Sequence, residues 1–209
     1  ATQPVAANAP ASATAATQPV AANAPDTAPA PSYVLPTAVT VDGRAYPVRT
    51  DFRVILDLLV MLTDPDLTDG DKTEALLRIF YEERPENRRA AVEACLDFIE
   101  PRTPPPGAPR NLVDWERDFD LMVAPVNRIL GTECRALPYL HWRSFLAAYL
   151  EIGPETLFGR VLRLREKLRG GKKLEKDERA FLRRNRDLVI LPTRFSSGEE
   201  ALLSEWTST

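Results

Sequence analysis

His141 is the chain's only histidine and the first residue to consider for acid–base chemistry, because imidazole titrates near neutral pH. It precedes Trp142 at the start of an aromatic-rich stretch. A lone histidine in such a place packs or caps a helix far more often than it acts as a base. Ser144 belongs to the same predicted helix and cannot complete a Ser-His-Asp triad, and the sequence has no Gly-x-Ser-x-Gly turn. We therefore expect no catalytic residues and no enzyme activity.

Metal and cofactor chemistry is also not indicated. Cys95 and Cys134 lack the close spacing of zinc ligands, and Cys95 falls on the apolar face of a predicted helix, as a buried reduced thiol in a reducing compartment would. Asp114 and Asp118 share a helical face and could suggest a cation site, but acidic residues in a first turn complement the helix dipole and explain them more simply. No glycine-rich loop has phosphate-binding spacing. We expect neither a metal nor a cofactor.

Charge is distributed unevenly along the chain. Residues 160–186 hold 12 Lys or Arg and 4 Asp or Glu, a net charge of +8 in a chain whose net charge is −3. This polarity favours a polyanionic or acidic partner, or else a solvated face that pairs with the acidic remainder. Phe181 is the only aromatic residue there, and helix-turn-helix and zinc-finger spacings are missing. A nucleic-acid-binding accessory protein that uses this segment stays an alternative.

The aromatic stretch lies on the first of two consecutive predicted helices. Trp142, Phe145 and Tyr149 repeat on one face of the first helix, which Gly153-Pro154 ends. We expect this face to pack as core against Trp115 and Phe119, and the two helices to form an antiparallel pair. The apolar stripe of the second helix is Leu157, Val161, Leu164 and Leu168. Its basic outer flank is Arg160, Arg163 and Lys167.

The remaining elements complete a mainly α-helical bundle of about seven helices with a small N-terminal β-hairpin. Asp42-Gly43 is the turn signal of the hairpin, between two alternating segments. The helix over 51–62 is apolar almost all round, so we expect it at the centre of the bundle, with Thr50 as its cap. Further helices are predicted from Thr68 to 84 with Asp71 in a capping box, over 86–99, over 113–130 with a kink at Pro125, and over 175–188.

Composition divides the chain into three parts. Residues 1–36 are an Ala/Pro-rich segment in which ATQPVAANAP occurs twice, and we expect a disordered tail. Residues 37–190 form the helical domain, and 191–209 a tail or a short helix. The proline-rich run 101–109 is an exposed connector. Neither a signal peptide nor a membrane-spanning run is recognisable, and the missing first Met suits a trimmed chain, a fragment or part of a longer product.

Four segments of the chain stand out as motifs that occur in a fixed order. They are Tyr46-Pro-Val-Arg-Thr-Asp-Phe-Arg53, Asp114-Trp-Glu-Arg-Asp118, Tyr139-Leu-His-Trp142 with Phe145, and Thr156-Leu-Phe-Gly-Arg-Val161 with Arg165. Together they resemble the bacteriophage "gene product fifteen" family, over about residues 40–190. The departures are Arg143 and Leu164, at positions where this family often has aromatic residues.

The resemblance implies a role in phage tail morphogenesis. It suggests a tail-assembly chaperone that coats the tail tape-measure protein in the cytoplasm of the bacterial host and leaves before the virion is mature. A permanent tail or connector component of the virion is the alternative within the same process. The expected partner-binding residues are Trp142, Phe145 and Tyr149, if they are exposed, with Arg160, Arg163 and Lys167 steering an acidic partner.

Overall fold

The structure, a computed structural model, describes residues 33–100, 112–192 and 196–197. The chain divides into two units, residues 1–34 and 35–209, and every element below belongs to the second unit. The predictions for residues 1–32 of the Ala/Pro-rich tail, for the connector 101–109 and for residues 198–209 lie outside the described residues.

The predicted hairpin is confirmed. Strands β1 (Ala38–Val41) and β2 (Arg44–Pro47) pair antiparallel, with Val39 opposite Tyr46. Asp42 and Gly43 have φ angles of 49° and 80°, which is the two-residue turn that matches the twist of the strands. Val48 then forms an isolated bridge with Tyr81. This bridge joins the hairpin to the helical part of the unit. A two-stranded sheet needs such support because it is only marginally stable by itself.

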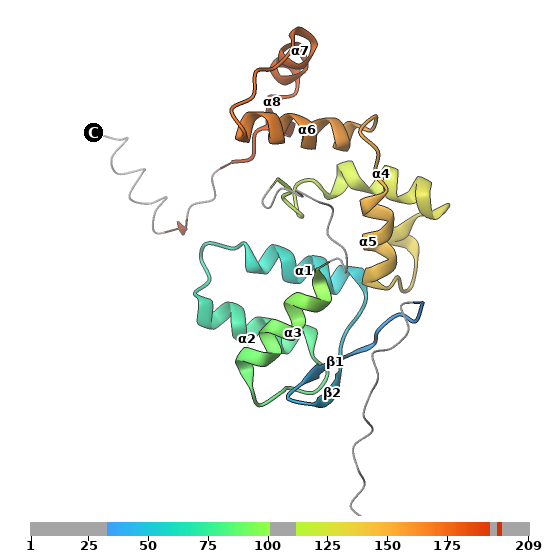
Figure 1. The fold of residues 1–209 in the computed structure, drawn as a ribbon, viewed down its shortest axis with the longest axis vertical. Coiled ribbons are helices and arrows are strands. Elements are labelled where there is room, and N and C mark those ends of the chain that lie inside the picture. The colour runs from blue at the N-terminus through green and yellow to red at the C-terminus, as the bar shows by residue number, and fades with distance from the viewer. Residues whose placement is uncertain (1–32, 101–111, 193–195, 198–209) are drawn as a thin grey trace, which may run out of the picture. The chain divides into compact units, whose positions relative to one another are not determined.

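Three helices follow the hairpin and pack in sequence, α1 on α2 and α2 on α3 (Figure 1). They are α1 (Phe52–Leu62), α2 (Asp69–Phe80) and α3 (Arg88–Ile99). The predicted capping box of Thr68 and Asp71 at the start of α2 is confirmed. At the start of α1, Asp51 and not Thr50 is the cap, because the Asp51 carboxylate accepts the Arg53 N–H at 3.0 Å.

The second half of the unit is also helical. The prediction of one helix over 175–188 is corrected, because Asn185 leaves helical geometry (φ −128°, ψ 37°) and separates two helices. Among the residues that the structure describes there are eight α-helices and one hairpin, so the predicted mainly α-helical class is confirmed. The remaining elements are α4 (Phe119–Leu130), the 3-10 helix η1 (Cys134–Ala136), α5 (Trp142–Leu150), α6 (Leu157–Arg169), α7 (Lys176–Arg184) and α8 (Arg186–Val189).

The expected antiparallel pair of α5 and α6 is a further correction. Helix α5 packs mainly on α4 and α1, whereas α6 packs mainly on α8 and α4. The buried face of α6 is accordingly rotated from the predicted stripe. Leu157 and Leu168 are 47% and 37% exposed, and the buried positions are Phe158, Val161, Leu164 and Arg165. Arg165 takes part in this face because it pairs with an acidic partner on the segment before α4, as described below.

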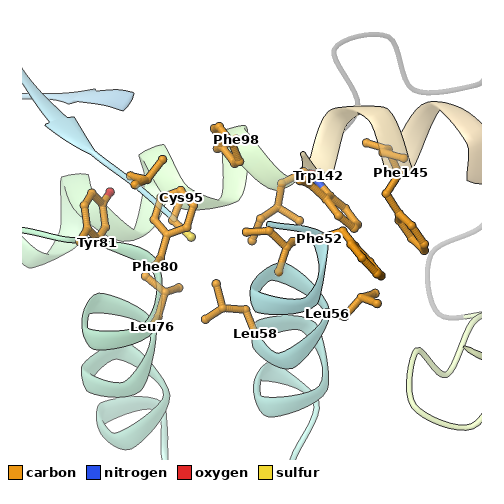
Figure 2. Packing of buried hydrophobic residues seen from close by; sticks show 14 of the residues in the cluster. Phe52, Leu56, Leu58, Leu76, Phe80, Tyr81, Cys95, Phe98, Trp142 and Phe145 are labelled. Carbon is orange, nitrogen blue, oxygen red and sulfur yellow. The ribbon is translucent and has the colours of Figure 1, made fainter. Parts of the chain in front are cut away.

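The main hydrophobic core joins the hairpin, α1, α2, α3 and α5 (Figure 2). Phe52 of α1 stacks on Phe145 of α5, with ring centroids 4.7 Å apart. Trp142 lies beside Phe145 at 5.8 Å and is 1% exposed. Cys95 is a buried free thiol, as predicted, and burial raises its pKa to about 12. Helix α5 is therefore held to α1 by aromatic packing.

Candidate partner-binding site

Residues of the first family-like segment are used to hold the fold together. Arg49 donates from Nη1 to the carbonyl oxygens of Arg78, Ile79 and Tyr81, at 3.0, 2.9 and 2.6 Å. These carbonyls end α2 and have no partner further along the helix. Arg49, which follows strand β2 in the chain, therefore caps the C-terminal end of α2.

The segments around Thr50 and Leu140 form a continuous backbone junction. The Phe52 N–H donates to the Leu140 carbonyl at 2.9 Å, and the Trp142 N–H donates to the Thr50 carbonyl at 2.7 Å. The Thr50 and Tyr139 hydroxyl groups are hydrogen-bonded at 2.6 Å. The start of α1 and the start of α5 are thus fixed to each other, although 89 positions separate Thr50 from Tyr139.

His141 caps α5 and has no free ring nitrogen. Its Nδ1 accepts the Arg143 N–H at 3.0 Å, so the ring proton is on Nε2, which donates to the Pro36 carbonyl at 2.9 Å. The side chain is also 3% exposed. The prediction that this histidine packs or caps a helix is confirmed.

Asp118 and Arg165 form a buried, bidentate ion pair. The Arg165 Nη1 and Nη2 atoms lie 2.5 and 2.9 Å from the two Asp118 carboxylate oxygens. The remaining Arg165 N–H groups donate to the carbonyls of Leu112, Leu188 and Val189, while Asp118 also accepts the Asp114 N–H at 2.9 Å. This pairing replaces the helix-dipole explanation of Asp118. Helix α4 begins at Phe119, later than the predicted residue 113.

The Thr-Leu-Phe-Gly segment at 156–159 has a local structural role. Thr156 caps α6 by accepting the Gly159 N–H at 2.9 Å, and its hydroxyl donates to the Gly153 carbonyl at 2.8 Å. A Cβ atom at position 159 would lie 2.4 Å from the Gly153 oxygen. Only glycine fits where the preceding turn approaches the helix so closely.

The predicted partner-binding residues do not form one exposed surface. Trp142 and Phe145 are 1% and 0% exposed, so the condition that they be accessible to a partner is not met. Tyr149 is half-buried against Trp115, with centroids 5.1 Å apart, and burial raises its pKa to about 12. The expectation that these rings pack as core on Trp115 is confirmed, because α5 turns its aromatic face towards α1 and the segment before α4.

The basic flank of α6 is partly engaged within the chain. Arg160 and Arg163 are exposed, but the Arg160 guanidinium stacks over Phe181 at 4.1 Å. Lys167 is half-buried and bonds Glu178 at 2.6 Å, and this contact lowers the pKa of Glu178. Arg165 is buried in its pair with Asp118, so Arg160, Arg165 and Lys167, among the twelve cations of 160–186, are engaged within the chain.

An open apolar groove of about 720 Å³ runs along α1, beside Trp115 and Phe119. The floor of this α1 groove consists of Phe52, Leu56, Val60, Met61, Trp115 and Phe119. Its charged rim consists of Arg53, Asp57, Asp64, Glu116 and Arg135. Sequence reasoning missed the groove because it joins segments more than 50 positions apart. The sequence of α1 contained a signal for the groove. This helix is apolar almost all round, so it has more apolar surface than one core contact covers.

The two arginines of the rim are oriented by neighbouring acids. Arg53 lies 3.3 Å from the Asp51 carboxylate and also donates to the Leu137 carbonyl. Arg135 bonds Glu133 at 2.8 Å, and this hydrogen bond lowers the pKa of Glu133 to about 2. Both arginine side chains stay partly in solvent, with exposed fractions of 41% and 54%. They remain accessible to an additional acidic group.

The described residues show neither a membrane helix nor a metal cluster. No helix in the described ranges is long and apolar enough to cross a membrane. In the same part of the chain, no three His, Cys, Asp or Glu side chains gather as metal ligands would. Independently of these two findings, the α1 groove combines an apolar floor with a charged rim, which suits binding of another molecule.

These contacts define a mainly helical protein in which the family-like residues hold the elements together and an apolar groove stays open. Residues 33–104 match the sequence model of the family described as Bacteriophage Gp15 protein. The match confirms the resemblance over this segment, which is similar to a family of bacteriophage proteins. The matched segment holds the hairpin, α1, α2 and α3, whereas the motifs at 114–118, 139–142 and 156–161 lie beyond it. No significant match was found among curated proteins or solved structures.

Proposed function

We propose that this protein is a non-enzymatic tail-assembly chaperone that binds helices of the tail tape-measure protein in the cytoplasm of the bacterial host. The observation that carries the proposal is the α1 groove, with its apolar floor and charged rim. The match of residues 33–104 to a bacteriophage family supports a phage-related role. A tape-measure protein is a long helical chain that exposes apolar stripes until the tail tube encloses it. A chaperone for it needs an open surface for such stripes.

The dimensions of the groove suit an amphipathic helix. Helix α1 has 11 residues, which corresponds to about 17 Å at 1.5 Å per residue. Three turns of a partner helix could lie along this length and bury their apolar residues on Val60 and Trp115. The rim carries both signs of charge, and pairing at the rim would select the orientation of the helix more than it would add affinity.

Val60→Asp is the variant that tests the groove. Val60 lines the groove, is half-buried and lies outside the main core cluster. A carboxylate there would be desolvated by an apolar partner helix, so we expect co-purification with co-expressed tape-measure protein to fall about tenfold or more. Circular dichroism and the melting temperature should change little. Leu96→Asp is the matched control, since Leu96 is 42% exposed on α3 and lies away from the groove. Equal binding by Val60→Asp and the parent would contradict the groove as the binding surface.

The departing chaperone and the permanent tail component differ in where the protein is found after assembly. A chaperone that leaves should be abundant in cells during assembly and missing from purified mature virions. Quantitative mass spectrometry of both fractions measures this directly. Stoichiometric protein in the virions would support the alternative of a permanent tail or connector component and exclude the departing chaperone.

A nucleic-acid-binding function of residues 160–186 has less support. Arg165 is buried, Lys167 is paired with Glu178, and Arg160 is stacked on Phe181. These cations are less available to phosphate groups than the sequence suggests. We therefore retain the exposed Arg163 and its neighbours as steering charges for an acidic protein partner, in addition to the groove.

A further inference from the structure

Two acidic side chains flank the apolar centre of the α1 face that lines the groove. Asp57 and Asp64 both line the groove and are seven positions apart, which is about two helical turns or 10 Å. The turn continues past the end of α1 as far as Asp64, because the Asp64 N–H donates to the Met61 carbonyl at 3.2 Å. Val60 and Met61 lie between the two acids on the floor. An acid therefore stands at each end of this apolar stretch.

These two carboxylates have no counter-charge within the described ranges 33–100, 112–192 and 196–197. No Lys or Arg of these ranges forms an ion pair with either of them. The rim arginines, in contrast, have acids of their own, since Arg53 pairs with Asp51 and Arg135 pairs with Glu133. The uncompensated charge along the groove face of α1 is therefore negative.

The C-terminal end of α1 strengthens this negative potential. Its last turn contains no basic residue, and its C-cap, Thr63, directly precedes Asp64. The carbonyl groups at a helix C-terminus carry a partial negative charge, which adds to that of a neighbouring carboxylate. A cation beside Asp64 would therefore interact with both the side chain and the end of the helix.

We propose that the α1 groove recognises an amphipathic helix that carries two Lys or Arg residues seven positions apart beside its apolar stripe. This recognition rests on the proposed function, because it takes the partner to be a helix, supplied by the tape-measure protein. Seven positions are two turns in the partner as well, so both cations can meet Asp57 and Asp64 when the partner lies along α1. The apolar side chains between them then lie on Val60. Only this stripe needs to be basic, so the partner as a whole can be acidic.

Arg53 fixes the register of such a helix. It lines the groove four positions before Asp57, which is about one turn along the same face. A partner shifted by one turn towards the start of α1 would place a cation beside Arg53 and lose its contact with Asp64. Repulsion disfavours this register. The charged rim therefore selects among apolar helices, whereas burial on the floor supplies most of the affinity.

Fluorescence anisotropy with synthetic peptides and the full chain tests the proposal. The probe is a stapled helix of about four turns with a leucine stripe and two lysines seven positions apart, and the comparison peptide has glutamates at the same two positions. We expect the lysine peptide to bind about tenfold more tightly at low salt, because it gains two ion pairs where the other peptide meets two repulsions. High salt should reduce this ratio.

The Asp57→Asn and Asp64→Asn double variant should lower the ratio to about two or less, with an unchanged circular dichroism spectrum. Asparagine keeps the size of each side chain and removes its charge. Asp97→Asn is the matched control, since Asp97 is exposed on α3 and does not line the groove. It should leave the ratio as it is in the parent.

The other outcomes overturn the proposal. Equal affinity for the two peptides would mean that the rim does not discriminate between charges, and tighter binding of the glutamate peptide would assign recognition to Arg53 and Arg135. An equal effect of Asp97→Asn and the double variant would trace the ratio to net charge. Binding of neither peptide would exclude the groove as a helix site. Because no tape-measure protein is present, the expected ratio together with failed tape-measure co-purification would exclude only the chaperone function.

Discussion

Trp142→Ala is expected to lower the free energy of unfolding by about 3–5 kcal/mol, because removal of a large buried ring leaves a cavity that its neighbours only partly fill. Trp142 is 1% exposed and lies between Phe145 and Trp115, with centroid distances of 5.8 and 6.2 Å. Its indole N–H donates to the Ile99 carbonyl at 2.9 Å, so the substitution also leaves that buried oxygen without its donor. Urea denaturation followed by far-ultraviolet circular dichroism measures the loss.

Trp142→Phe is the control for this result. It keeps an aromatic ring in the core and removes the indole N–H, so its effect should be clearly smaller than that of alanine. Any loss of partner binding by Trp142→Ala should then follow the loss of folded protein. A Trp142→Ala protein that melts like the parent but no longer binds a tape-measure protein would show instead that this ring belongs to a partner surface.

Arg165→Ala is expected to destabilise the protein by about 3–5 kcal/mol, because it leaves the Asp118 carboxylate buried without its counter-charge. The two side chains are 3% and 1% exposed, and Arg165 also satisfies the carbonyls of Leu188 and Val189. Asp118→Ala should have a similar effect for the same reason. Thermal and urea denaturation of both variants give the magnitudes.

The double variant separates a buried ion pair from two independent contributions. Asp118→Leu combined with Arg165→Met removes both charges and restores apolar volume, so its destabilisation should be well below the sum of the two single alanine effects. Lys167→Ala is the matched control, because Lys167 lies on the same helix as Arg165 and its pair with Glu178 of α7 is more exposed. Loss of this pair should change stability by about 1 kcal/mol or less. Additive effects of Asp118 and Arg165 would argue against their coupling.

Both results bear on how the family-like motifs should be interpreted. Arg49 caps α2, His141 caps α5, and Asp118 with Arg165 joins α4 to α6 and α8. These motif residues are therefore engaged in holding the fold. Partner recognition is expected from the α1 groove, to which the motifs also contribute Phe52 and Trp115 on the floor and Arg53 and Glu116 on the rim.

Features set by neighbouring residues were predictable from the sequence. The Asp42-Gly43 turn, the capping box of Thr68 and Asp71, and the helical or capping role of His141 all depend on contacts within a few positions. Helical periodicity likewise predicted the mainly α-helical class and the buried faces of Trp142 and Cys95. Local sterics and hydrogen bonding determine these features, so a short stretch of sequence is sufficient to specify them.

The arrangement of these elements was decided by tertiary contacts. The pairing of Asp118 with Arg165 spans 47 positions, and α6 packs mainly on α8 and α4 instead of on α5. The α1 groove exists because Trp115 and Phe119 come beside one face of α1. An apolar helical face has the same sequence pattern whether it packs in the core or lines an open groove. Only the packing of distant segments determines which apolar face remains in solvent, since hydrophobic burial has no directional preference of its own.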